Sequence, residues 1–268
     1  MLKQRILTAI SLLPVVVVLI LYAPLSWLAL MLVVVVGLAA YEWAILSGYA
    51  GRPARYGYTA VTLLICVMLY ISGLHVGWNT LLSVLAWVAA AWWLSALILV
   101  VFVHDSMPRP LKSVCGWLTL VPALFTAVAV ADARAGFLLW MFCIIWAADI
   151  GAYFAGKAFG RHKLAPVVSP GKTWEGVAGG TLAMIIVAIV GWFWLTDRSQ
   201  PLLLAVCVLT GWISIVGDLS ESLFKRQAGV KDSGTLFPGH GGALDRVDSL
   251  TAAAPFFWLG LKLVGWHA

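Results

Sequence analysis

The chain contains nine apolar runs, each close to the length of a membrane-spanning helix. A bilayer core of about 30 Å needs roughly 20 helical residues. With 63% hydrophobic and only 10% charged residues, a soluble domain could not cover its surface. The sequence therefore predicts an all-α polytopic integral membrane protein with about nine transmembrane helices, at residues 6–23, 25–46, 57–76, 80–103, 114–131, 136–156, 177–195, 202–224 and 249–266.

Two longer polar loops, at residues 157–176 and 225–248, lie between these runs, and short connectors join the others. No repeat or low-complexity segment divides the chain. We expect one membrane domain over residues 1–268, in which 1–135 supply N-terminal transmembrane helices and 136–268 supply the candidate catalytic helices and cytoplasmic loops. The first run follows basic residues as a signal peptide does, but no small-residue cleavage site follows it. We interpret it as a retained first helix.

The basic residues are distributed unequally between the two sides that this helix pattern predicts. Only Arg134, Arg198 and Lys262 fall on one side, and the other 14 of the 17 Lys and Arg fall on the opposite side. The positive-inside rule assigns the richer side to the cytoplasm. We therefore expect a cytoplasmic N-terminus, and we interpret the net charge of +6 as topology signals and lipid contacts with the bilayer, not as nucleic-acid binding.

Four acidic residues lie inside predicted helices: Glu42, Asp149, Asp218 and Glu221. A carboxylate in a membrane span is costly and usually marks a site or a pathway. The predicted topology places all four in the inner third of the bilayer, which favours a polar cavity open to the cytoplasmic side. We expect functional roles for Asp149 and Asp218. For Glu42, a functional role is as compatible with the sequence as a structural one, in which the side chain reaches the interface or pairs with a loop arginine.

Asp218, Ser222 and Lys225 share one helix face, because they are spaced i, i+4 and i+7. That face could hold a metal at one end and a phosphate at the other. In the loop that follows, Asp245 and Asp248 stand at the start of the ninth predicted helix. Each alone would serve as an ordinary helix cap, but with Asp218 they provide three carboxylates of the kind that binds Mg²⁺.

The loop over residues 157–176 contains Gly171-Lys172-Thr173, which is similar to the end of a P-loop. A P-loop would also need a glycine at position 166, where this chain has proline, and a preceding strand. We therefore reject a P-loop here. Ser169 before Pro170 instead predicts a helix start with Ser169 as its N-cap. Further along, the small residues Gly176 and Gly180 predict close helix packing.

Three blocks of this sequence resemble the phosphatidate cytidylyltransferases, also called CDP-diacylglycerol synthases. The similarity is specific over residues 145–250. The matching residues are Asp149-Ile-Gly-Ala-Tyr153-Phe154-Ala-Gly156-Lys157, then Ser169-Pro170-Gly171-Lys172-Thr173-Trp174-Glu175-Gly176, then Ser222-x-Phe224-Lys225-Arg226 with Lys231-Asp232, His240-Gly241-Gly242 and Asp245-Arg246-Val247-Asp248.

The resemblance implies a multi-pass enzyme of the bacterial inner membrane, in phospholipid biosynthesis, that makes CDP-diacylglycerol and pyrophosphate from CTP and phosphatidate. It implies Mg²⁺ dependence and leaves room for a second, monovalent cation. The catalytic residues that it implies are Asp218, Asp245, Asp248, Lys225 and Arg246. The substrate-binding residues are Ser169, Lys172, Thr173, Glu175, Ser222, Arg226, Lys231, Asp232 and His240. The metal ligands are Asp218, Asp245 and Asp248, with Asp149 as a further candidate.

Other functions fit parts of the pattern. A CTP-dependent polyprenol or dolichol-type lipid kinase would also need Mg²⁺ and CTP. A transporter would use the buried acids for cation coupling, and a structural membrane subunit would not need polar loops rich in glycine and aspartate. For His240, a structural hydrogen bond and a phosphate or proton role are equally compatible with the sequence. The sequence leaves open whether the chain forms a homodimer.

Overall fold

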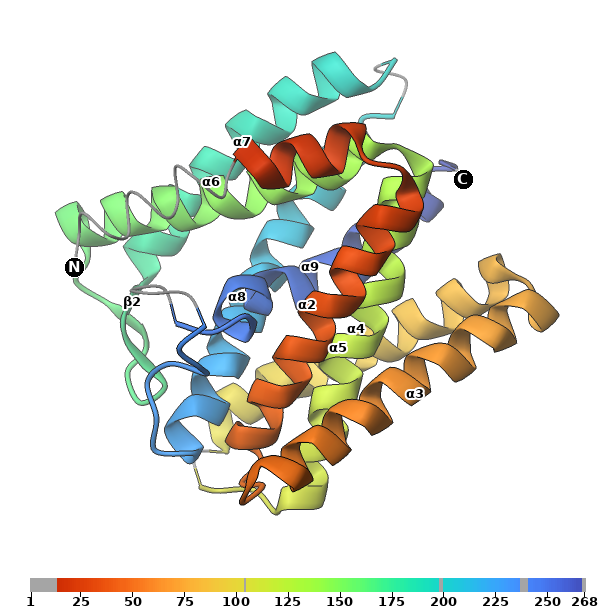
Figure 1. Cartoon of the computed structure of the whole chain (residues 1–268). Coiled ribbons are helices and arrows are strands. Elements are labelled where there is room, and N and C mark those ends of the chain that lie inside the picture. Colours follow the sequence, from red (N-terminus) through yellow and green to blue (C-terminus); the bar gives the residue numbers. More distant parts are fainter. Residues whose placement is uncertain (1–13, 104, 198–199, 237–240, 267–268) are drawn as a thin grey trace.

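The computed structural model describes residues 14–103, 105–197, 200–236 and 241–266. Residues 14–22 are helical, and the remaining described chain forms eight long helices with one short two-stranded hairpin (Figure 1). In chain order the elements are α2 (Leu25–Leu46), α3 (Arg52–Val76), α4 (Trp78–Phe102), α5 (Arg109–Ala133), α6 (Ala135–Phe159), β1 (Lys163–Ala165), β2 (Ser169–Thr173), α7 (Trp174–Leu195), α8 (Leu202–Gln227) and α9 (Leu244–Leu263).

The helical, multi-pass character of the chain is confirmed. Seven described helices, α2 to α8, are long and apolar enough to cross a membrane. Residues 6–13 of the first predicted span lie outside the described residues. The ninth predicted span falls in α9, which begins earlier than expected and contains Asp245, Arg246, Asp248 and Lys262, so α9 is not among the seven. The total of nine spans stays a prediction.

Two short connections that the apolar runs predict, at Ala23-Pro24 and just before Gly136, are confirmed. Ala23 and Pro24 separate the helical residues 14–22 from α2, and Arg134 alone separates α5 from α6. Pro24 is the N-cap of α2, a position at which the missing N–H of proline costs no hydrogen bond within the helix. The chain changes direction at both connections (Figure 1).

Small residues bring α6 and α7 into close contact, as the spacing of Gly176 and Gly180 predicts. A methyl group on Gly176 would lie 2.9 Å from the Ala152 carbonyl oxygen, and one on Gly180 would lie 2.6 Å from the Ala148 carbonyl oxygen. Both distances are too short for a side chain, so these backbones touch directly. This packing fixes α7, and with it the hairpin that leads into α7.

The core of the described chain lies around α9, which packs against α8, α5 and α4. The stretch Ala252–Ala254 and Phe257 is fully buried. In Figure 1, the turn between α3 and α4 projects away from the other helices, whereas α2, α5, α8 and α9 are gathered centrally and α4 runs back behind them. Helices from both halves of the sequence therefore surround the segment that contains Asp245 and Asp248.

The expectation that Ser169 starts a helix was wrong. Ser169 lies in β2, where it pairs with Ala165 in the antiparallel hairpin. Helix α7 begins five residues later, and its N-cap is Thr173, whose Oγ1 accepts a 3.1 Å hydrogen bond from the Gly176 N–H. Ser-Pro suits either structure, because proline is also tolerated on the edge strand of a sheet, and the pairing with β1 decides between them.

Candidate active site

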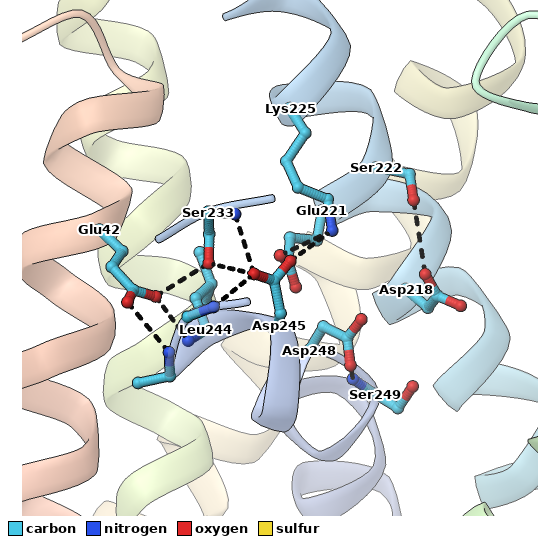
Figure 2. Close-up of polar contacts among 12 residues, drawn as sticks. Glu42, Asp218, Glu221, Ser222, Lys225, Ser233, Leu244, Asp245, Asp248 and Ser249 are labelled. Atoms are coloured by element: carbon cyan, nitrogen blue, oxygen red, sulfur yellow. Dashed lines mark hydrogen bonds and ion pairs between the residues drawn. The ribbon is translucent and has the colours of Figure 1, made fainter. Parts of the chain in front are cut away.

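The C-terminal half of α8, the loop after it and the start of α9 bring most of the predicted acids together (Figure 2). The side chains form two adjoining groups. One group is centred on Asp245 and is largely enclosed by protein. The other is centred on Asp218 and is partly open to solvent.

Asp245 is fully occupied by protein donors. Its Oδ1 accepts a 2.8 Å hydrogen bond from Lys225 Nζ. Its Oδ2 accepts hydrogen bonds from the Gly242 N–H at 2.8 Å and from Ser233, through the N–H at 2.9 Å and the hydroxyl at 2.8 Å. The side chain is 7% exposed. In this structure Asp245 therefore holds the loop against the start of α9.

Lys225 lies between two buried acids. Its Nζ is 3.0 Å from Glu221 Oε1 as well as 2.8 Å from Asp245, and its side chain is 12% exposed. The face predicted from the i, i+4, i+7 spacing is therefore divided. Ser222 Oγ donates a 3.4 Å hydrogen bond to Asp218, whereas Lys225 turns away to Glu221 and Asp245.

Asp218 pairs with a cation delivered by the hairpin. Lys172 Nζ forms an ion pair with Asp218 Oδ2, and the two side chains are 27% and 28% exposed. The hairpin is held in place by Val168, which is buried against Leu219 and Leu223 of α8. Lys172 therefore approaches Asp218 on a supported strand.

Asp218 also faces other carboxylates. Asp149 of α6 and Asp248 of α9 each lie close enough to Asp218 for their like charges to repel. Asp248 Oδ1 accepts a 2.6 Å hydrogen bond from the Ser249 N–H, and Figure 2 shows Asp248 on the side of Asp245 that faces Asp218. Three helices thus direct negative charge at one region.

The predicted metal ligands are only partly assembled. Within the described ranges, no three His, Cys, Asp or Glu side chains are grouped closely enough to share one metal ion. Asp218 and Asp248 nevertheless fit Mg²⁺, because both offer hard oxygen ligands and a cation would relieve their repulsion. The ammonium group of Lys172 already meets this need for positive charge at Asp218.

The other predicted site residues fall into two sets. Arg246, next to Asp245 in α9, is exposed and attracts Asp149. Lys231 and Asp232 are exposed on the loop before α9, and His240 lies outside the described residues.

The second set supports the hairpin. Arg226 Nε donates a 3.4 Å hydrogen bond to the Val168 carbonyl oxygen. Glu175 accepts hydrogen bonds from the N–H groups of Arg161 at 3.1 Å and His162 at 3.2 Å, and its carboxylate is 2.6 Å from His162 Nδ1. In this structure these groups organise the strand that presents Lys172.

Sequence reasoning did not assign Glu221, Ser233 or Glu42 to the site. The pairing of Glu42 with a loop arginine is not seen among the described residues: its carboxylate is buried and accepts hydrogen bonds from the start of α9. For Glu42 and Glu221, the signal available in the sequence was an acidic residue within an apolar run. Ser233 carries no such signal in the sequence.

The fold and this site define a polytopic membrane protein whose polar groups suit a phosphate-bearing substrate. The model of the cytidylyltransferase family matches residues 3–264, and the chain therefore belongs to the cytidylyltransferase family. It is similar to the phosphatidate cytidylyltransferase of Pseudomonas aeruginosa, with 42% identity over 276 residues that cover 100% of both chains.

Two further relatives bear the same name. The phosphatidate cytidylyltransferase of Haemophilus influenzae is 40% identical over 281 residues, which cover 96% of this chain and 97% of the relative. That of Brucella suis is 44% identical over 165 residues, which cover 55% of this chain and 58% of the relative. The resemblance seen in the signature residues thus extends along the whole chain.

Proposed function

We propose that this protein transfers CMP from CTP to phosphatidate, giving CDP-diacylglycerol and pyrophosphate. Family membership and two relatives that match over nearly their full length support this activity. The observation that carries the assignment of the site is the approach of Asp218 and Asp248 from two helices, with Lys172 placed on Asp218 by the hairpin.

The metal in this proposal is Mg²⁺, held by Asp218 and Asp248. Asp245 would become a third ligand when a substrate phosphate draws Lys225 away from it, and Asp149 is a further candidate. A bound Mg²⁺ supplies neutralisation of the triphosphate charge and of the pyrophosphate that leaves. A second, monovalent cation near the same acids is compatible with their surplus of negative charge.

The protein's own residues must bring two polyanions together. A phosphate oxygen of phosphatidate attacks the α-phosphorus of CTP, the new P–O bond forms, and the bond from that phosphorus to the β-phosphate oxygen breaks. Lys172 and Arg246 would neutralise the phosphates, and arginine can form two parallel hydrogen bonds to one phosphate. The lipid phosphate is already ionised, so the reaction needs no strong general base.

The site would lie on the cytoplasmic side of a bacterial inner membrane. The unequal distribution of Lys and Arg supports this orientation, the seven apolar helices support a multi-pass protein, and the named relatives are bacterial. A lipid headgroup stays at the interface, whereas CTP arrives from the aqueous phase. A site near the inner ends of α8 and α9 would serve both substrates.

Labelled CTP tests the proposal. We expect the purified protein, with phosphatidate and Mg²⁺, to move label from the α-phosphate of CTP into lipid and label from the γ-phosphate into pyrophosphate. A lipid kinase would instead place the γ-label in the lipid. Absence of lipid labelling from either position, with no pyrophosphate released, would contradict the proposal and favour a transporter.

A further inference from the structure

Glu42 links the N-terminal half of the chain to the start of α9. It lies near the C-terminal end of α2 and its side chain is 6% exposed. Its Oε1 accepts a 3.0 Å hydrogen bond from the Ala243 N–H, and its Oε2 accepts a 2.8 Å hydrogen bond from the Leu244 N–H. Figure 2 shows Glu42 pointing at the beginning of α9 from the neighbouring helix.

These hydrogen bonds replace a missing helix cap. The first N–H groups of a helix have no partner within the helix and need an acceptor from elsewhere. The N-cap residue of α9 is Ala243, whose methyl side chain accepts no hydrogen bond. Because Ala243 and Leu244 are buried, water is a poor substitute, and Glu42 provides both the acceptor atoms and the negative charge that a helix N-terminus favours.

The loop before α9 closes on the same carboxylate. Ser233 Oγ lies 2.9 Å from Glu42 Oε2 and 2.8 Å from Asp245 Oδ2, so its one proton can be donated to either acid. A side chain at Gly234 or Gly242 would collide with the Glu42 carboxylate. The loop therefore approaches the Glu42 carboxylate closely at two glycines, and it is joined through that carboxylate to the start of α9.

We propose that Glu42 is a positioning residue, which fixes the start of α9 so that Asp248 faces Asp218. Asp248 follows Leu244 by four residues, or about 6 Å along the helix axis, so a displacement of the helix start is transmitted directly to it. This inference rests on the proposed metal site at Asp218 and Asp248. It assigns Glu42 a role in that site without contact with substrate.

The test compares Glu42→Gln with Tyr58→Phe. A glutamine keeps one acceptor oxygen but presents an amide donor where Glu42 accepts from an N–H. Tyr58 is buried, and its hydroxyl donates a 2.9 Å hydrogen bond to the Ser113 carbonyl oxygen, between α3 and α5. The control therefore also loses a buried hydrogen bond, but away from α9.

The readouts are lipid labelling as a function of Mg²⁺ concentration, and thermal unfolding in detergent. We expect Glu42→Gln to raise the Mg²⁺ concentration for half-maximal activity at least about tenfold, the effect typical of losing a group that supports metal ligands. Tyr58→Phe should lower the unfolding temperature without changing the Mg²⁺ requirement. An unchanged Mg²⁺ requirement in folded, active Glu42→Gln would overturn the inference.

Glu42→Asp keeps the inference testable if Glu42→Gln does not fold. Aspartate retains the charge but is shorter by one methylene, so its carboxylate no longer reaches both N–H groups at their present distances. We expect a rise in Mg²⁺ requirement between those of wild type and Glu42→Gln, and a wild-type requirement would contradict us. If the wild-type protein itself labels no lipid, that result contradicts the proposed function and does not contradict the role of Glu42.

Discussion

Replacing Asp218 and Asp245 separately by asparagine should separate activity from stability. Asp218 is 28% exposed and pairs with a lysine that is 27% exposed. An ion pair of this kind contributes at most about 1 kcal/mol to folding, because solvent screens it. Asp245 is 7% exposed and neutralises Lys225, which is 12% exposed. Removing one partner of a buried pair costs about 3–5 kcal/mol when the other charge is left uncompensated. Because Lys225 keeps Glu221 as a partner at 3.0 Å, we expect Asp245→Asn to cost about 3 kcal/mol, the lower end of this range.

These energies predict different unfolding temperatures. For a chain of this size, 1 kcal/mol corresponds to about 2–4 °C. Asp218→Asn should therefore unfold within about 4 °C of wild type, and Asp245→Asn should unfold roughly 6–12 °C lower. Both variants should lose at least about 100-fold in kcat/KM, Asp218→Asn through loss of a metal ligand and Asp245→Asn through loss of the proposed third ligand and displacement of the loop before α9.

The assay combines thermal unfolding in detergent with transfer of α-labelled phosphate into lipid. Asp132→Asn is the matched control, since Asp132 is exposed near the end of α5 that leads into α6, and it should change neither quantity. Wild-type stability of Asp245→Asn would show that Asp245 does not hold the loop as described. Near-normal turnover in Asp218→Asn would remove Asp218 from the metal site.

Three further outcomes follow from the same geometry. Lys172→Met should lower kcat/KM for CTP by about tenfold or more, because a phosphate partner is lost. It should also lower the Mg²⁺ concentration for half-maximal binding by up to about fivefold, because no ammonium group then competes for Asp218. An increased Mg²⁺ requirement would contradict this. Gly217→Ala should reduce stability by about 1–3 kcal/mol and should also reduce activity, because the new methyl group would lie 2.7 Å from the Asp248 carbonyl oxygen. The control Gly57→Ala should be tolerated, because no atom lies within 4 Å of the methyl group there. Removing divalent ions with EDTA should stop pyrophosphate release and added Mg²⁺ should restore it; activity in EDTA would exclude the proposed cofactor.

The sequence predicted those features that depend on local pattern. Apolar length identified the spans α2 to α8, and the turn at Pro24 followed from the ring geometry of proline. The hairpin was missed because its two strands are short and their pairing joins Lys163 to Thr173, a contact that periodicity does not encode. Ser169 before Pro170 fits both a helix start and an edge strand, so the sequence alone could not choose.

For the candidate site, the sequence identified the acids but not their partners. Helical spacing placed Asp218 and Lys225 on one face, yet Lys225 turns to Glu221 and Asp245, because burial of two carboxylates near it requires a cation. The hydrogen bonds from the start of α9 to Glu42 join residues about 200 positions apart. Only the packing of α2 beside α9 reveals them.

The proposed site depends most on a divalent ion shared by Asp218 and Asp248. Mn²⁺ can take the place of Mg²⁺ in such sites and is counted directly by electron paramagnetic resonance of the purified protein with CTP. We predict a bound Mn²⁺ whose affinity falls at least about tenfold in Asp218→Asn and in Asp248→Asn alike, with no change in Asp132→Asn. Wild-type Mn²⁺ affinity in either site variant would contradict the shared site.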